Sequence, residues 1–305
     1  MTNIGLIIAI IKVGLMAVGF FNNQYETKAQ NDIEESEYEY ETESEDENFT
    51  TNVDNAKGQY ALEYGVYLSD EYDELPSDVS CETIVIDAQY YSKEEVAALK
   101  KTNGTVLSYL NIGSIEGFRD YYNDYQDLIL GPYENWDGEY WIDVSDQQWQ
   151  DFITEDIATS LINKGVDGFF IDNTDVYYFY PDQDIYNGVT SILKSLKGKN
   201  MQVIINGGDT YVSKYLEENG SLDPVLDGVN QESVFSSINW DDESFEENDQ
   251  ESKDYFLDYL FDVASDGKKV FLLEYTTDES LIQTIKEQSS KLGYTTYISD
   301  SLELD

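Results

Sequence analysis

The sequence of 305 residues contains no histidine and a single cysteine, and these two shortages narrow the chemistry open to the protein. Without histidine, serine–histidine triads, histidine general bases and the usual zinc sites are excluded. Cys81 cannot form a disulfide within the chain and has no histidine to activate it, so we expect a small buried residue there. Proton transfer must therefore rely on carboxylates, lysine or tyrosine.

Positive charge is also scarce. The chain has 17 Lys and Arg against 63 Asp and Glu, which gives a formal net charge of -46. Such an excess of negative charge opposes binding to the phosphates of nucleic acid and to anionic lipid headgroups. We expect no nucleic-acid partner, and a cationic or neutral ligand fits better.

Two N-terminal segments are expected to lie outside the catalytic domain. Residues 1–22 are nearly all apolar apart from Lys12, which predicts a signal peptide or a membrane anchor, and hence an extracellular or surface-anchored protein. No basic residue opens the segment and no small-x-small cleavage motif closes it, so both readings stay open. Residues 23–57 are acidic and lack apolar periodicity, which predicts a disordered linker. Membrane contact is expected only through the first segment.

From residue 58 to 305 short apolar runs alternate with stretches of helical pattern, as in βα units around a parallel sheet. An open doubly wound sheet would carry a glycine-rich phosphate loop after its first strand, and none follows here. We therefore predict one α/β domain, a (β/α)₈ TIM-type barrel, and a monomer. Its strands are expected at 64–68, 83–87, 106–111, 168–172, 202–206, 228–232, 270–275 and 295–299.

Helices are predicted between these strands. Capping boxes at Ser92 with Glu95 and at Ser145 with Gln148 precede two of them, and Gly104 and Gly165 stand where C-terminal caps belong. Residues 69–80 are too short for a full helix, and the long aromatic stretch 113–140 is expected to be an elaborated loop. The predicted helices are 92–101, 149–164, 185–196, 210–218, 254–264 and 280–292.

Several predicted strands end on polar residues. The carboxyl ends of barrel strands converge on one face, which is where catalysis is placed. Among these residues, Asp172 and Glu232 lie two strands apart and can flank a substrate. Such a pair suits hydrolysis of a glycosidic bond, which needs one carboxylate at the anomeric carbon and one acid to protonate the leaving oxygen. The strand-end residues are Asp87, Asn111, Asp172, Asn206, Glu232 and Glu274.

A metal site is the competing interpretation of the same acids, because hard oxygen ligands suit calcium or magnesium. The acids in question are Asp87, Glu116, Asp172 and Asp175, and they lack the spacing of a calcium loop. We therefore expect no metal and no other cofactor.

Aromatic residues support a sugar ligand, because pyranose rings expose C–H faces that stack on flat side chains. With 26 tyrosines in the chain, many must simply pack in the core or lie on the surface. The aromatic residues in the predicted mouth are Trp136, Trp141, Tyr177, Tyr178, Tyr180 and Tyr275.

Five segments, together with the strand end at Asn206, resemble in their order along the chain those of glycoside hydrolase family 114, the endo-α-1,4-polygalactosaminidases. They are residues 106–119, 140–144, 164–175, 229–235 and 273–275, of which 164–175, with Gly165, Gly168 and Asp172 among its residues, is the most specific. The resemblance implies a (β/α)₈ barrel that cleaves α-1,4-linked galactosamine polymers. It places the nucleophile on Asp172 and the acid on Glu232.

The same resemblance implies sugar contacts at Glu116, Asp143, Asp175 and Glu274, and acids there suit a substrate that carries ammonium groups. The full set of expected substrate-binding residues is Asp87, Glu116, Trp141, Asp143, Asn173, Asp175, Asn206, Glu274 and Tyr275.

The resulting hypothesis is an extracellular, endo-acting and retaining hydrolase of a galactosamine-containing exopolysaccharide. Two alternatives stay open: a barrel that binds a surface glycan without cutting it, and a hydrolase of a neutral α-galactoside.

Overall fold

A computed structural model of the chain describes residues 60–69, 71–133, 138–240 and 242–305. The N-terminal segments predicted over 1–22 and 23–57 lie outside the described residues. Within the described ranges, no helix combines the length and apolar character needed to cross a membrane.

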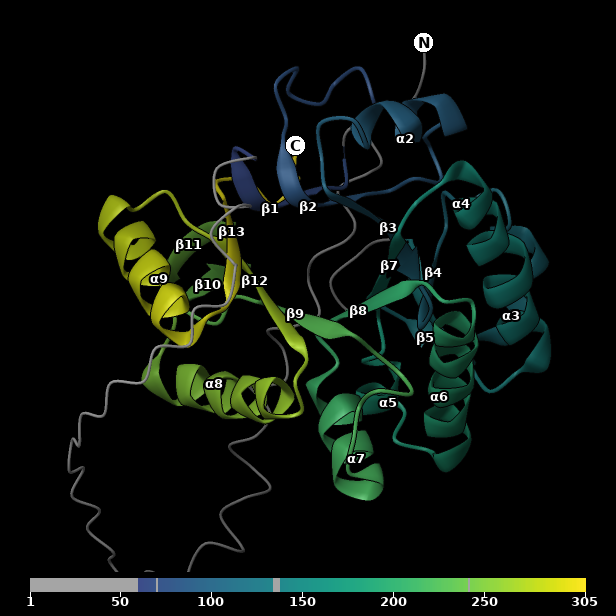
Figure 1. Ribbon diagram of the computed structural model, residues 1–305. Coiled ribbons are helices and arrows are strands. Elements are labelled where there is room, and N and C mark those ends of the chain that lie inside the picture. Colours follow the sequence, from purple (N-terminus) through teal and green to yellow (C-terminus); the bar gives the residue numbers. More distant parts are fainter. Residues whose placement is uncertain (1–59, 70, 134–137, 241) are drawn as a thin grey trace, which may run out of the picture.

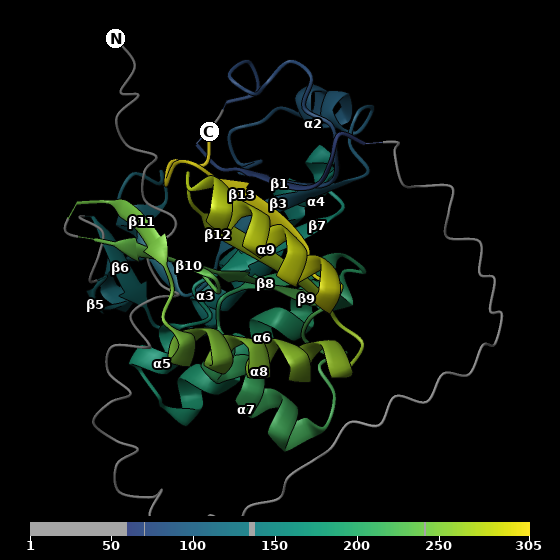
Figure 2. The ribbon, with the colours of Figure 1, turned by 90° about the vertical axis from the view of Figure 1, so that its left-hand side faces the viewer.

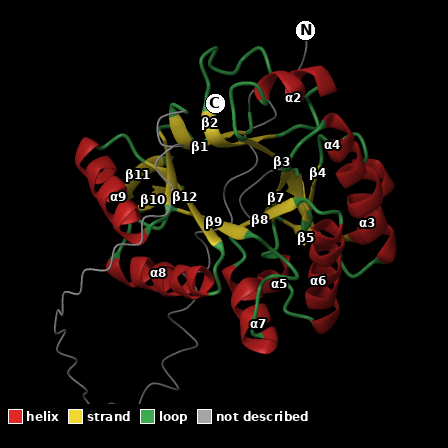
Figure 3. Cartoon of the chain, in the orientation of Figure 1, coloured by secondary structure: helices red, strands yellow, loops and turns green. Residues whose placement is uncertain are grey.

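Eight parallel strands form a nearly closed barrel (Figure 1). Each strand is hydrogen-bonded to the next one around the barrel, and the last lies beside the first (Figure 3). The predicted (β/α)₈ fold is confirmed, with each strand within two residues of its expected bounds. The strands are β1 (Leu62–Tyr67), β2 (Cys81–Ile86), β3 (Thr105–Asn111), β7 (Gly168–Asp172), β8 (Gln202–Asn206), β9 (Gly228–Glu232), β12 (Lys269–Tyr275) and β13 (Thr295–Ser299).

Helices cover the outside of the barrel, and Figure 2 shows α6, α7 and α8 packed along one side of it. The predicted helix over 149–164 is one helical stretch whose middle, Phe152–Ile157, winds as a wider π-helix. The α-helices are α2 (Lys93–Leu99), α3 (Gln147–Asp151), α4 (Ala158–Lys164), α5 (Val176–Phe179), α6 (Gln183–Gly198), α7 (Asp209–Asn219), α8 (Gln250–Ser265) and α9 (Glu279–Leu292).

The helix-boundary predictions are confirmed at two positions. The capping box at Ser92 is present, and Gly165 ends α4 in the left-handed conformation, with φ 104°. Two others are wrong. Asp146 caps α3 in place of Ser145, whose hydroxyl bonds to Asp143 instead. Gly104 caps nothing, because α2 ends at Lys100 and the Gly104 amide joins the strand ladder through the carbonyl of Cys81.

The stretch 113–140, expected to be a loop, contains a small antiparallel sheet. Its strands are β4 (Ser114–Glu116), β6 (Glu139–Ile142) and β5 (Ile129–Pro132), in that order. Strands of three or four residues are too short to show an alternating pattern, which is why the sequence did not reveal them. A second insertion, the hairpin of β10 (Ser236–Asn239) and β11 (Ser244–Glu247), follows β9.

Alternation along the strands decides which side chains enter the barrel, because successive residues face opposite sides of a sheet. On β7, Phe169 and Ile171 pack in the outer layer under the helices, whereas Phe170 belongs to the cluster inside the barrel. Asp172 therefore continues the inward-facing series. Cys81 is fully buried in the outer layer, as predicted.

Candidate active site

One amide joins the two predicted catalytic acids. Asn206, at the end of β8, donates from Nδ2 to Asp172 Oδ1 at 3.1 Å and to Glu232 Oε1 at 2.8 Å. Its Oδ1 accepts from Asn230 Nδ2 at 2.7 Å, and Asn230 in turn accepts from the Tyr64 hydroxyl at 3.1 Å. Because this series of hydrogen bonds fixes the orientation of the Asn206 amide, both Nδ2 hydrogens face the carboxyl groups. The strands therefore bring together the pair expected from the sequence.

A tyrosine hydroxyl binds the other oxygen of each acid. Tyr109 donates to Asp172 Oδ2 at 3.1 Å, and Tyr275 donates to Glu232 Oε2 at 3.0 Å. Tyr275 was expected to touch the sugar, but its side chain is fully buried and serves Glu232. Each acid is thus held by one amide and one phenol.

The two acids differ in how tightly they hold a proton. Burial raises the pKa of Asp172 to about 7, against the opposing effect of the hydrogen bonds from Asn206 and Tyr109. Burial raises the pKa of Glu232 well above its usual range, and the charge of Asp172 raises it further. Neighbouring carboxyl groups do not easily ionise together. Burial and the neighbouring charge of Asp172 therefore both favour the protonated form of Glu232.

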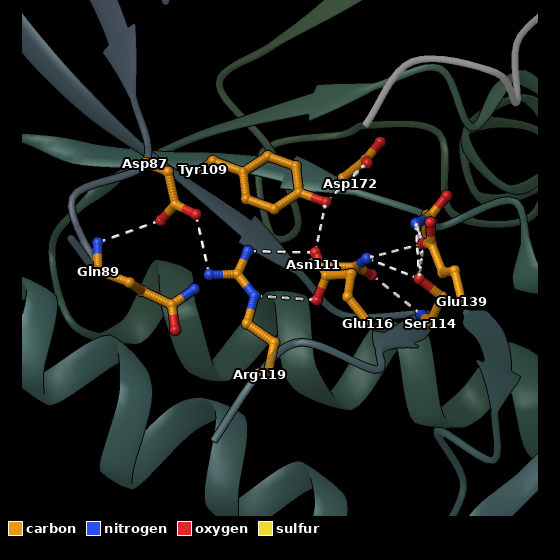
Figure 4. A network of polar contacts seen from close by, with 10 residues as sticks. Asp87, Gln89, Tyr109, Asn111, Ser114, Glu116, Arg119, Glu139 and Asp172 are labelled. Atoms are coloured by element: carbon orange, nitrogen blue, oxygen red, sulfur yellow. Dashed lines mark hydrogen bonds and ion pairs between the residues drawn. The ribbon is translucent and has the colours of Figure 1, made fainter. Parts of the chain in front are cut away.

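Arg119 occupies a position that the sequence did not reveal (Figure 4). It binds Glu116 through Nε and NH2, both at 3.1 Å, and Asp87 through NH1 at 2.9 Å. Asp87 and Glu116 were expected to contact substrate, and here they share a buried cation. Burial raises the pKa of Asp87, and Arg119 opposes that change. Within the described residues, Arg119 is the one Lys or Arg that is buried as a whole residue.

Asn173 and Asp175 lie on the turn after β7, as expected from the 164–175 segment. Asn173 has a positive φ of 64° and is buried beside Asp172. Asp175 accepts from the Gly208 amide at 3.1 Å. Burial, followed by the charges of Asp209 and Asp172, raises the pKa of Asp175 well above its usual range.

Three further residues that were expected to contact the sugar are engaged by other parts of the protein. Trp141 is 1% exposed and packs against Tyr133 and Phe179, so its ring offers no face to a sugar. Glu274 faces the outside of the barrel, because its neighbours Leu273 and Tyr275 face inward. Its carboxyl group accepts hydrogen bonds from backbone amides of the turn after Glu232. Asp143 is half-buried and binds Ser145.

Four other aromatic residues were predicted to line the mouth. Tyr177, Tyr178 and Tyr180 are half-buried on or beside α5, and Trp136 lies outside the described residues.

Glu139, at the start of β6, is a further carboxyl group of the mouth that the sequence did not reveal. Its Oε1 accepts from Ser114 Oγ, from Asn111 Nδ2 at 3.2 Å and from Asn173 Nδ2 at 3.1 Å. Its Oε2 is buried without a hydrogen-bond partner. A lone acid at the start of a short aromatic strand gives no recognisable signal in a single sequence.

The described part of the chain holds no group of three His, Cys, Asp or Glu side chains arranged to bind a metal ion. The acids of the mouth are bound instead by amides, phenols and Arg119. Together they form a buried, carboxyl-rich site around the pair Asp172 and Glu232.

Comparison with known proteins identifies the family of the chain. The sequence model of glycoside hydrolase family GH114 matches residues 40–305. An uncharacterised protein of Methanocaldococcus jannaschii is 23% identical over 99% of this chain and 92% of its own length.

Two solved structures share the fold. The glycoside hydrolase domain of PelA from Pseudomonas aeruginosa superposes with a TM-score of 0.67 and 17% identity, over 80% of this chain and 96% of that one. Aspergillus fumigatus Ega3, solved in complex with galactosamine, superposes with a TM-score of 0.60 and 18% identity, over 85% of this chain and 98% of that one.

Proposed function

Because this chain belongs to glycoside hydrolase family GH114, and is therefore a glycoside hydrolase, we propose that it is a retaining, endo-acting enzyme on α-1,4-linked galactosamine polymers. In this proposal Asp172 is the nucleophile and Glu232 is the acid. The apolar N-terminal stretch supports an extracellular site of action, where such polysaccharides are found.

The observation that carries the proposal is the donor shared by the two acids. Bonds of 3.1 and 2.8 Å to the same Asn206 nitrogen keep Asp172 Oδ1 and Glu232 Oε1 less than about 6 Å apart. Carboxyl groups about 5–5.5 Å apart are typical of retaining enzymes, whereas inverting enzymes need about 6.5–9.5 Å to admit a water molecule. The spacing therefore supports retention.

The order of the two pKa values fits these roles. An ionised Asp172 attacks the anomeric carbon while Glu232 gives its proton to the leaving oxygen. Glu232, now charged, then takes a proton from the water that displaces Asp172 from the sugar. Asn206 contacts both acids throughout and can follow the negative charge from one to the other.

The charge of the site supports a cationic sugar. Arg119 is already bound to Asp87 and Glu116, so Asp172, Glu232 and the other buried acids have no cation from the described residues. An ammonium group of galactosamine would supply positive charge at low cost. The complex of Ega3 with galactosamine agrees with this choice.

The test is release of reducing ends from a partially deacetylated galactosamine polymer by the pure protein. Hydrolysis is expected for the wild type and loss of it for both Asp172→Asn and Glu232→Gln, and proton NMR of the first product should show the α-anomer. A β-anomer first would overturn retention. Binding without turnover would favour a glycan-binding barrel, and activity on α-galactosides that is insensitive to salt would favour a neutral substrate.

A further inference from the structure

The residue after Asp172 has an unusual backbone conformation. Asn173 has φ 64°, in the left-handed region that residues other than glycine seldom occupy and that asparagine adopts more readily than most. On its backbone side, Gly113 lies so close that a Cβ would come within 1.7 Å of the Asn173 carbonyl oxygen. That contact limits where the turn carrying Asp172 can lie.

On its side-chain side, Asn173 is bound by the small inserted sheet. Its Nδ2 donates to Ser114 Oγ at 2.9 Å and to Glu139 Oε1 at 3.1 Å, and its Oδ1 accepts from the Tyr133 hydroxyl at 3.3 Å. Glu139 Oε1 also accepts from Asn111 Nδ2 at 3.2 Å. Glu139 therefore ties the end of β3 to the turn after β7 (Figure 4).

No described cation offsets a charge on Glu139. It is 3% exposed, and the ionisable groups that face it are Glu116, Asp172, Tyr109 and Tyr133. Burial, followed by the charge of Glu116, raises the pKa of Glu139 well above its usual range. Burial thus disfavours the charged form of Glu139, and the hydrogen bonds that the group accepts all go to Oε1.

We propose that Glu139 is a positioning residue of the reaction: it holds Asn173 in the left-handed conformation and thereby fixes the direction in which Asp172 faces the anomeric carbon. The inference rests on the proposed role of Asp172 as nucleophile. Its contacts suit this role, because one oxygen, Oε1, accepts both from Asn173 on the turn after β7 and from Asn111 at the end of β3. A charge on Glu139 would favour the protonated, unreactive form of Asp172, and the burial of Glu139 opposes such a charge.

The test compares Glu139→Gln with Glu139→Ala. Gln has the shape and neutrality of the protonated acid and keeps an acceptor for Asn173, so kcat should stay within about threefold of the wild type. Ala removes the acceptor, and we expect kcat to fall about 10–100-fold with KM changed less than about twofold, because misplaced reacting groups chiefly slow the chemical step. Glu82→Ala, an exposed acid on β2, is the control and should keep full activity.

A second measurement does not depend on turnover. Carbon-13 NMR titration of the Asp172 carboxyl, assigned against Asp172→Asn, should show the pKa moving back toward its usual lower value in Glu139→Ala, because a loosened turn lets water reach Asp172 and lessens the burial that raises its pKa. The pKa should be unchanged in Glu139→Gln, which keeps the turn in place. If Glu139→Gln is as inactive as Glu232→Gln, or if Glu139→Ala leaves both kcat and the titration unchanged, the positioning role is wrong. A wild type that titrates as expected but cuts no polymer contradicts the proposed substrate instead.

Discussion

The Asp172 side and the Glu232 side of the barrel mouth have the same arrangement of strand end, hydrogen bonds and turn, and differ in the glutamate that holds the turn. Each acid ends a strand, accepts from Asn206 and from a tyrosine, and precedes a residue with positive φ: 64° at Asn173 and 54° at Ser233. The turn after Asp172 is held by Glu139, from a sheet inserted outside the barrel. The turn after Glu232 is held by Glu274, from β12 of the barrel itself.

The two buried glutamates also differ in how they are bound. Glu274 accepts from the amides of Val234, Phe235 and Ser236 and from the Ser236 hydroxyl at 2.6 Å, so both of its oxygens are used. Burial raises its pKa to about 7, against these hydrogen bonds. Glu139 uses one oxygen only. The turn after Glu232 is therefore fixed through both carboxyl oxygens of Glu274, whereas the turn after Asp172 is fixed through one carboxyl oxygen of Glu139.

The largest expected effect separates the two catalytic acids themselves. Glu232→Ala should lose at least about 1,000-fold in kcat/KM on the polymer, yet recover much of it on an aryl galactosaminide whose leaving group needs no proton. Asp172→Ala should stay inactive on both substrates, because no covalent intermediate can form. Steady-state kinetics on the two substrates measure the difference. Equal recovery by both variants would reverse or abolish the assigned roles.

The next effect tests the contrast between the two glutamates. In Glu274→Gln an amide NH₂ group replaces one of two oxygens that accept from N–H or O–H donors, leaving buried donors unpaired at about 1–3 kcal/mol each. We expect a lower melting temperature and a kcat reduced about tenfold or more, whereas Glu139→Gln should be nearly silent. Thermal unfolding and kinetics of both variants check this.

The matched control is Glu279→Gln, on the exposed first turn of α9, which should behave as the wild type. If Glu274→Gln is as stable and active as Glu139→Gln, the two glutamates do not differ in how they hold the turns after Glu232 and Asp172.

The same contrast shows what the sequence could and could not predict. Most barrel strands were found because they are short runs of apolar, β-branched or aromatic residues between helical stretches, and the pair Asp172 and Glu232 followed from where two of the predicted strands end. Alternation along β12 would also have shown that Tyr275 faces inward and Glu274 outward, since Leu273 lies inside the barrel. Glu139 and Arg119 could not be found in this way, because they belong to the insertion 113–140, whose short strands carry no periodic signal.

The last effect concerns stability, and its size depends on pH. Because burial raises the pKa of Asp172 from 3.8 to about 7, the folded protein binds this proton more tightly than the unfolded chain, and the free energy of unfolding falls as pH rises from about 4 to about 7. Asp172→Asn removes that loss, so the variant should gain up to about 4 kcal/mol on the wild type at pH 7.5 and nothing at pH 4. Urea unfolding at the two pH values measures the gain. A gain of equal size at both pH values would mean that the charge of Asp172 does not cause it. The ionisation of Asp172 would then not destabilise the folded protein.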